Sequence, residues 1–151
     1  MKEKIVKFIS TGFFTGYIPY APGTFGALLG IPLLYILKKL PLPLSFILVI
    51  LFSGFSIFIS DSARKVYNSR DPRCVVIDEI AGYLYAGIFF PFTLKFVALS
   101  FILFRLFDIL KPYPVNKSEL LNGGWGIVLD DVISGLFSAM FLFGLKILLK
   151  F

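Results

Sequence analysis

The sequence predicts an all-α protein, a polytopic membrane bundle of about four to five apolar helices, some of them short. Two observations predict this class. Hydrophobic residues make up 58% of the 151 residues, above the roughly 45–50% that is usual in soluble domains. Residues 40–60 carry no charge, and such a segment is long enough for one helix to cross a hydrocarbon core of about 30 Å. The length indicates a single domain over residues 1–151.

The first two helices are expected over residues 25–37 and 44–60, joined by a Pro-containing turn. The basic residues that flank this pair are Lys2, Lys4, Lys7, Arg64, Lys65, Arg70 and Arg73. Because Lys and Arg gather in cytoplasmic loops, both flanks are expected in the cytoplasm, with an even number of crossings between them. The amino terminus has no convincing signal-peptide pattern and is expected to remain.

A third crossing is expected over about residues 75–91, a fourth over 96–107 and a fifth from residue 132. This layout brings the polar segments APGTFG, DPRCVVIDE, RLFDILKPYP and GGWGIVLDD to one side of the membrane. Small residues also recur at a spacing of four, as in Gly82 with Ala86 and Gly135 with Ala139. Such spacing lets helix backbones approach closely, so one compact bundle is expected.

Five of the nine acidic residues lie inside or directly beside the apolar segments. They are Asp78, Glu79, Asp108, Asp130 and Asp131. An ionised carboxylate is costly to remove from water unless a cation or a hydrogen-bond network compensates it. Ionisable residues in such positions are therefore candidates for function, and these five are the predicted catalytic residues.

The available basic side chains do not neutralise all of these acids. Arg105, Asp108 and Lys111 follow each other at helical spacing, so they form either a structural ion-pair stripe or part of a site. The two acidic doublets, Asp78 with Glu79 and Asp130 with Asp131, remain in surplus.

A divalent cation fits that surplus. With no His and a single Cys in the chain, oxygen ligands favour Mg²⁺ over Zn²⁺, and the predicted ligands are the four carboxylates of the doublets. Mg²⁺ usually keeps waters and a substrate phosphate, which Arg105 and Lys111 are expected to bind.

The APGTFG segment is a second candidate for phosphate binding. Glycines such as Gly23 allow an anion to approach backbone N–H groups, and Thr24 is expected to cap the helix that begins near residue 25. A plain capped turn explains the same residues.

Several reaction classes are excluded. The absence of His removes His-nucleophile phosphatases, Ser-His-Asp triads and HExxH zinc hydrolases. Cys74 is not followed by the Arg of a cysteine-phosphatase loop, and there is no Walker A motif. The net charge of +6 is spread between apolar segments without a recognition motif, so no nucleic-acid partner is expected.

The ordered motifs PGTFG, DPRCVVIDEIAGY, FRLFDILKPYP and GGWGIVLDDVISG resemble the phosphatidylglycerophosphatase A family of bacterial membrane enzymes. The resemblance covers most of the chain and implies Mg²⁺-dependent hydrolysis of phosphatidylglycerophosphate to phosphatidylglycerol in phospholipid synthesis. It also implies an inner-membrane protein whose active site faces the cytoplasm. The implied site comprises the five acids, with Thr24, Arg105 and Lys111 beside them.

Two other functions stay open from the sequence. A small ion or proton carrier would also use carboxylates in apolar helices, but it predicts acids near helix midpoints. A non-catalytic membrane scaffold would need the acids only as partners of Arg and Lys.

Overall fold

The computed structural model describes residues 3–150, so Lys2, which belongs to the basic amino-terminal flank, lies outside the described residues. Within that range the chain forms α-helices, one short 3-10 helix and no strand. The helices are α1 (Glu3–Ser10), α2 (Pro22–Leu37), α3 (Leu42–Tyr67), α4 (Ile77–Gly87), α5 (Leu94–Leu110), α6 (Val115–Ser118) and α7 (Gly124–Leu149), and the 3-10 helix η1 covers Thr15–Tyr17. The predicted all-α class is confirmed.

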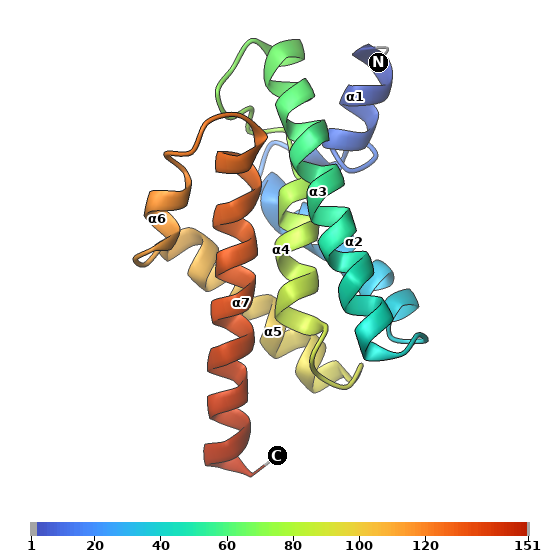
Figure 1. Cartoon of the computed structure of the whole chain (residues 1–151), viewed down its shortest axis with the longest axis vertical. Coiled ribbons are helices and arrows are strands. Elements are labelled where there is room, and N and C mark those ends of the chain that lie inside the picture. Colours follow the sequence, from blue (N-terminus) through green and yellow to red (C-terminus); the bar gives the residue numbers. More distant parts are fainter. Residues whose placement is uncertain (1–2, 151) are drawn as a thin grey trace.

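The five longer helices α2, α3, α4, α5 and α7 alternate in direction between the two ends of a bundle (Figure 1). The starts of α2, α4 and α7 and the end of α5 meet in one pocket. At the opposite end, the Lys38 side chain donates to the Ile88 carbonyl, and the Ser45 hydroxyl donates to the Leu37 carbonyl at 2.7 Å. The bundle therefore has one end that carries the polar segments and another made of short turns.

Helix α4 occupies the centre of the bundle and packs against α2, α3, α5 and α7. Almost all of its residues are buried. Its side chains join a cluster of buried apolar residues that includes Leu34 of α2, Val49 of α3, Phe104 of α5 and Val128 of α7. The apolar character of the IDEIAGYLYAG segment thus follows from burial among other helices.

Small residues allow the tightest of these contacts, as the sequence predicts. A Cβ atom at Gly135 of α7 would lie 2.1 Å from the carbonyl oxygen of Gly82 in α4, and a Cβ at Gly82 would lie 2.6 Å from the Asp131 carbonyl oxygen. A Cβ at Gly30 of α2 would lie 2.6 Å from the Tyr83 ring. Because glycine has no side chain, the backbones of α4 and α7 come into direct contact here.

The prediction of four to five helices long enough to cross a membrane is not confirmed. Among the described residues, only α3 and α7 are long and apolar enough. With 16, 11 and 17 residues, α2, α4 and α5 reach only about 24, 17 and 26 Å at 1.5 Å per residue, less than a typical core of about 30 Å. The sequence pattern located these helices but overestimated α4, which stops at Gly87 instead of near residue 91.

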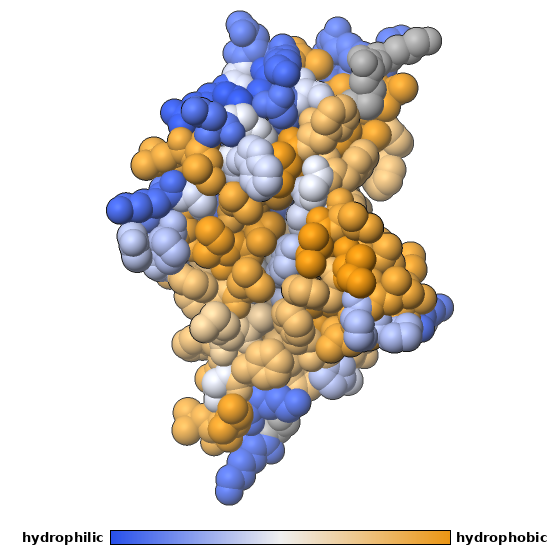
Figure 2. Space-filling model, in the orientation of Figure 1, coloured by the Kyte–Doolittle hydropathy of each residue, from blue (hydrophilic) through white to orange (hydrophobic). Residues whose placement is uncertain are grey.

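The long helices present apolar side chains to the outside of the bundle. Only 28% of the most apolar window of α3 and 33% of that of α7 is buried, whereas the core helix of a soluble protein is mostly buried. Exposed residues include Leu51 and Phe58 on α3 and Met140 and Ile147 on α7. In Figure 2, apolar side chains cover the middle of the visible face, between hydrophilic side chains at its two ends.

The contact between α4 and α7 can be tested with Gly135→Ala. The added methyl group would meet the Gly82 backbone, so we expect the free energy of unfolding to fall by about 1–3 kcal/mol, the usual cost of overpacking. Thermal unfolding in detergent, followed by circular dichroism, measures this change. Gly144→Ala is the matched control on α7, because a Cβ there meets nothing within 4 Å; equal melting temperatures for the two variants would contradict the packing argument.

Candidate active site

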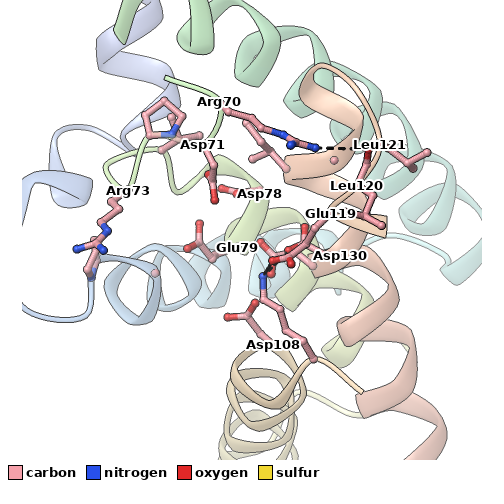
Figure 3. A pocket seen from close by; sticks show the side chains of 18 of the residues that line it. Arg70, Asp71, Arg73, Asp78, Glu79, Asp108, Glu119, Leu120, Leu121 and Asp130 are labelled. Atoms are coloured by element: carbon pink, nitrogen blue, oxygen red, sulfur yellow. Dashed lines mark hydrogen bonds and ion pairs between the residues drawn. The ribbon is translucent and has the colours of Figure 1, made fainter. Parts of the chain in front are cut away.

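A pocket of about 550 Å³ opens where α2, α4, α5 and α7 meet (Figure 3). Charged side chains dominate its lining. The acidic residues are Asp71, Asp78, Glu79, Asp108, Glu119, Asp130 and Asp131, and the basic residues are Arg70, Arg73, Arg105 and Lys111. The structure therefore brings all five predicted catalytic acids into one cavity, together with both predicted phosphate-binding bases.

The first turn of α4 supplies Asp78 and Glu79. The helix begins at Ile77, after Val76, whose N–H donates to the Ser10 carbonyl at 2.8 Å. The Asp78 residue is only 7% exposed. Burial raises the pKa of both carboxyls, because it removes the charged form from water. The partial positive charge at the start of a helix favours negative groups in this position, but it does not replace a cation.

Helix α7 supplies Asp130 and Asp131, and it begins at Gly124 instead of at the expected residue 132. The chain enters the helix through Gly123, whose φ of 75° is in the region that glycine adopts readily. A Cβ at Gly124 would lie 2.0 Å from the Ile57 carbonyl oxygen, so glycine also allows α7 to cross α3 here. Both aspartates consequently lie inside the helix and are buried, with exposures of 6% and 3%.

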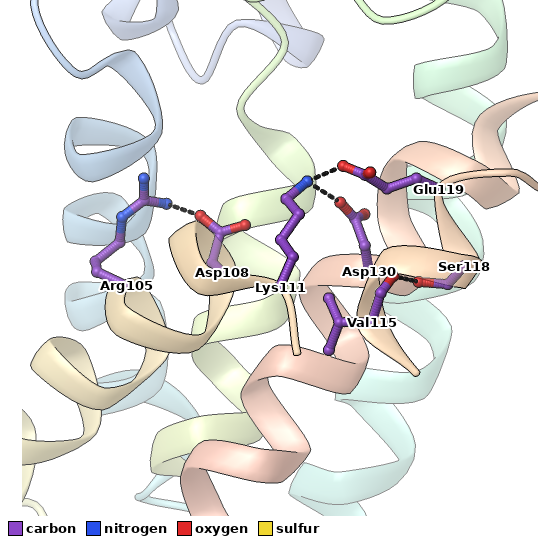
Figure 4. Close-up of polar contacts among 7 residues, drawn as sticks. All are labelled: Arg105, Asp108, Lys111, Val115, Ser118, Glu119 and Asp130. Carbon is purple, nitrogen blue, oxygen red and sulfur yellow. Dashed lines mark hydrogen bonds and ion pairs between the residues drawn. The ribbon is translucent and has the colours of Figure 1, made fainter. Parts of the chain in front are cut away.

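The end of α5 supplies Arg105, Asp108 and Lys111 (Figure 4). An Arg105 guanidinium nitrogen lies 2.7 Å from Asp108 Oδ2, so these two residues form an ion pair, as their spacing allows. Lys111 is beyond the helix, in a left-handed conformation with φ of 43°, and Pro112 follows it. The expected helical stripe from Asp108 to Lys111 is therefore not formed, because α5 ends at Leu110 and Lys111 does not have the helical backbone that would place its side chain beside Asp108.

Lys111 instead bridges two acids from other parts of the chain. Its ammonium group lies 2.8 Å from Asp130 Oδ2 and also donates to Glu119. Partial burial lowers the pKa of Lys111, but the hydrogen bonds to the two acids outweigh this effect and the net pKa is raised. Lys111 is therefore a permanent positive charge in the pocket.

The start of α2 forms the remaining wall. Ala21 has a left-handed backbone and Pro22 occupies the first helical position, where the missing N–H of proline costs nothing. A Cβ at Gly23 would lie 2.3 Å from Glu79 Oε1 and 3.1 Å from the Arg105 guanidinium. Glycine thus lets the α2 backbone touch the site.

The prediction that Thr24 caps a helix beginning near residue 25 is wrong. The helix begins at Pro22 with Ala21 as its cap, because proline starts the helix one turn earlier than the threonine signal suggests. Thr24 is not among the described residues that line the pocket.

Several carboxylate oxygens in the pocket are buried without a hydrogen-bond partner. They are Oδ1 of Asp78, Oε2 of Glu79, Oδ1 of Asp130 and Oδ1 of Asp131. Asp78, Glu79 and Asp131 can bring one oxygen each to within 4.8 Å of one another, and so can Asp108, Asp130 and Asp131. Buried carboxylates of this kind need a compensating cation when they are ionised, and oxygen-only ligands suit a hard divalent ion.

Sequence reasoning left out four charged residues of the pocket: Arg70, Asp71, Arg73 and Glu119. The first three belong to the loop before α4, and they precede Asp78 by at most eight positions. Their closeness to the acidic doublet in the sequence was a usable signal. Glu119 had no such signal, because its contact with Lys111 depends on how the chain folds back after α5.

Comparisons with known proteins identify the family of the chain. The family model of phosphatidylglycerophosphatase A matches residues 8–146. A putative phosphatidylinositol-3-phosphatase of Bacteroides thetaiotaomicron is 37% identical over 139 residues, which is 86% of each chain. Phosphatidylglycerophosphatase A of Escherichia coli is 31% identical over 137 residues, or 89% of this chain and 80% of the relative. The Haemophilus influenzae protein of the same name is 29% identical over 144 residues, or 93% and 88%. No solved structure matches the chain.

A helical bundle with a buried carboxylate pocket and adjoining cations, in a chain with these relatives, defines a lipid phosphatase, a hydrolase. The chain belongs to the phosphatidylglycerophosphatase A family.

The contact of Gly23 with the site gives a first test of the geometry. In Gly23→Ala the new methyl group would displace Glu79 or Arg105. We expect lipid phosphatase activity to fall about 10²-fold, the loss associated with misplacing a site group by roughly 1 Å. Phosphate release in detergent micelles measures it. Gly54→Ala, where a Cβ meets nothing within 4 Å, should retain full activity; an equally active Gly23→Ala variant would contradict the contact.

Proposed function

We propose that the protein is a Mg²⁺-dependent phosphatidylglycerophosphatase, which hydrolyses phosphatidylglycerophosphate to phosphatidylglycerol and phosphate in phospholipid synthesis. The observation that carries the proposal is the gathering of five acids, of which Asp78, Asp130 and Asp131 are buried, in an open pocket that also contains two bases, Arg105 and Lys111. Acids and bases in one cavity serve phosphoryl transfer, because the acids bind a metal and the bases bind phosphate oxygens.

The donor set of the pocket fits Mg²⁺. Asp78, Glu79, Asp130 and Asp131 each have a buried oxygen without a partner, and these four residues would hold the ion. When bound, Mg²⁺ polarises the phosphoryl group and makes a coordinated water more acidic.

The residues of the chain then have distinct tasks in hydrolysis. Arg105 and Lys111 bind the phosphate oxygens and stabilise the charge that spreads over them in the transition state. The small Gly23 lets the headgroup approach the α2 backbone. One of the site carboxylates accepts a proton as water attacks phosphorus, the P–O bond to the glycerol breaks, and the same carboxyl gives its proton to the glycerol oxygen.

The position of the acids favours this function over an ion carrier. Asp78 and Glu79 lie in the first turn of α4, and Asp130 and Asp131 lie in the first half of α7. They line a pocket at one end of the bundle, whereas a carrier is expected to place its carboxylates near helix midpoints.

The names of the relatives support a lipid phosphomonoester as substrate but give two headgroups. Two relatives are named for phosphatidylglycerophosphate and one, putatively, for phosphatidylinositol 3-phosphate. We propose the former, because the family model that covers residues 8–146 carries that name; the inositol lipid is the second candidate.

We further propose that α3 and α7 cross the bacterial inner membrane in a multi-pass arrangement, with the pocket facing the cytoplasm. Besides Arg105 and Lys111, the described helices and loops contribute, at the pocket end, Lys4, Lys7, Arg64, Lys65, Arg70, Arg73 and Lys117, and at the opposite end Lys38, Lys39, Lys95, Lys146 and Lys150. Basic residues are more numerous at the pocket end, which supports a cytoplasmic position.

Exposed aromatic residues support a position of the pocket end at the membrane surface. Phe13 and Phe14 pack on Phe8 beside the pocket-end helix α1, and Phe14 stacks on Tyr17. All four are exposed. Aromatic side chains gather at the membrane–water interface. A pocket at this level would meet lipid headgroups.

Purified protein in detergent is expected to release phosphate from phosphatidylglycerophosphate when Mg²⁺ is present, and to lose this activity in chelator. Asp131→Asn should lower the rate by about 10²-fold or more, comparable with the loss of one electrostatic stabilising group. Asp61→Asn is the control, because Asp61 pairs with Arg64 and Lys65 outside the pocket. Full activity in chelator would overturn the mechanism, and a higher rate with phosphatidylinositol 3-phosphate would overturn the substrate.

The scaffold alternative is tested by replacing both members of one ion pair. The double variant Arg105→Leu with Asp108→Leu keeps the formal charge of the pair but removes a phosphate ligand and an acid. We expect complementation of cells that lack phosphatidylglycerophosphatase activity to fail. Growth equal to that with the unchanged protein would support the scaffold.

The orientation is tested by labelling single cysteines after Cys74→Ser. Asn122, at the pocket end, and Lys39, at the opposite end, are both exposed. In spheroplasts, a membrane-impermeant maleimide should label Lys39→Cys directly and Asn122→Cys only after the membrane is permeabilised. The reverse pattern would place the pocket outside.

A further inference from the structure

The acids of the pocket form two groups that overlap at one residue. The first group, Asp78, Glu79 and Asp131, joins α4 to α7, and the second, Asp108, Asp130 and Asp131, joins α5 to α7. In each group three carboxylate oxygens lie within 4.8 Å of one another. Asp131 therefore belongs to both groups of carboxylates.

Each group also contains buried oxygens that no other residue satisfies. Asp78 Oδ1 and Glu79 Oε2 in the first group, Asp130 Oδ1 in the second and the shared Asp131 Oδ1 have no hydrogen-bond partner. Asp78, Asp130 and Asp131 are more than nine-tenths buried. Since buried polar atoms normally have partners, unsatisfied oxygens in both groups indicate a ligand for each.

The basic residues already present do not fill this role. Lys111 engages Asp130 through Oδ2, which leaves Oδ1 free for another ligand. Arg105 contacts Asp108 through Oδ2, at the side of the pocket away from Lys111 (Figure 4). Both cations thus sit at the edge of the second group and can stay there while a metal ion binds its remaining oxygens.

The charge of the pocket gives an independent argument for the number of ions. Seven acidic and four basic side chains line it, so its formal charge is −3 when all are ionised. One divalent ion leaves −1, which repels a phosphomonoester whose own charge is about −1.5 to −2 at neutral pH. Two divalent ions give +1, which attracts it.

We propose that the pocket binds two divalent cations, one held by Asp78, Glu79 and Asp131 and the other by Asp108, Asp130 and Asp131, with Asp131 bridging them. This inference rests on the proposed function for its Mg²⁺ and phosphate chemistry. It assigns Asp108, which the sequence marks only as a catalytic acid, to the second ion. Paired ions of this kind, about 3.5–4 Å apart, hold both the attacking and the leaving oxygen in phosphoryl hydrolysis.

The number of bound ions can be measured without turnover. The full chain in detergent is titrated with Mn²⁺, the paramagnetic substitute for Mg²⁺, and free Mn²⁺ is followed by electron paramagnetic resonance. We expect two ions per chain at saturation, and a bound signal broadened by coupling between the two ions. A single ion per chain in the unchanged protein would overturn the proposal, whatever the variants do.

Variants assign the ions to the two groups. Asp108→Asn and Glu79→Gln should each reduce the stoichiometry from two to one and abolish the coupling, whereas Asp61→Asn, outside the pocket, should keep two. Circular dichroism identifies any variant that does not fold. In that case the number of Mn²⁺ ions bound by the unchanged protein decides whether the proposal holds. Two ions retained in folded Asp108→Asn would contradict the second group.

The outcome is separable from that of the proposed function. Phosphatase activity that requires Mg²⁺ with only one Mn²⁺ bound would leave the function standing and remove the second ion. Two coupled Mn²⁺ ions without hydrolysis of either phospholipid would support the paired site and remove the proposed substrate.

Discussion

The contact between the backbones of α4 and α7 is the constraint on which the position of the site depends. Gly82 and Gly135 meet without side chains between them, so the two helices cannot separate or slide without losing this fit. The contact fixes the first turn of α4 against the turn of α7 that carries Asp130 and Asp131, and Asp78 and Glu79 consequently face Asp131. Around this pair, α5 and α2 need only deliver one end each to complete the pocket.

That arrangement creates an electrostatic problem which the chain solves only in part. At the edge of the pocket Arg105 pairs with one acid and Lys111 with two, and the central oxygens remain without partners. Complete internal pairing would stabilise the fold but leave no place for metal or phosphate. The incomplete compensation is therefore the feature that converts a buried ion cluster into a site for phosphoryl chemistry.

The same bundle shows why the apolar sequence does not translate directly into membrane crossings. Helix α4 is apolar because other helices surround almost all of its residues. Helices α3 and α7 are apolar largely on their outer faces. Composition alone cannot separate burial in protein from exposure to lipid, since both favour the same residues. Exposure separates the two cases, as the contrast between the buried α4 and the exposed α3 and α7 shows.

The sequence by itself determined the helical class, the order of the five bundle helices and the five acids that line the pocket, because these depend on hydropathy and on charges placed in apolar segments. Its spacing also predicted the small-residue contacts and offered the Arg105–Asp108 pair as one of two readings. Tertiary structure alone decided that Lys111 pairs with Asp130 and Glu119, that Thr24 stays outside the pocket, and that Asp131 belongs to two ligand groups. Those facts arise where helix ends from distant parts of the chain converge, and no local pattern encodes the distance between them.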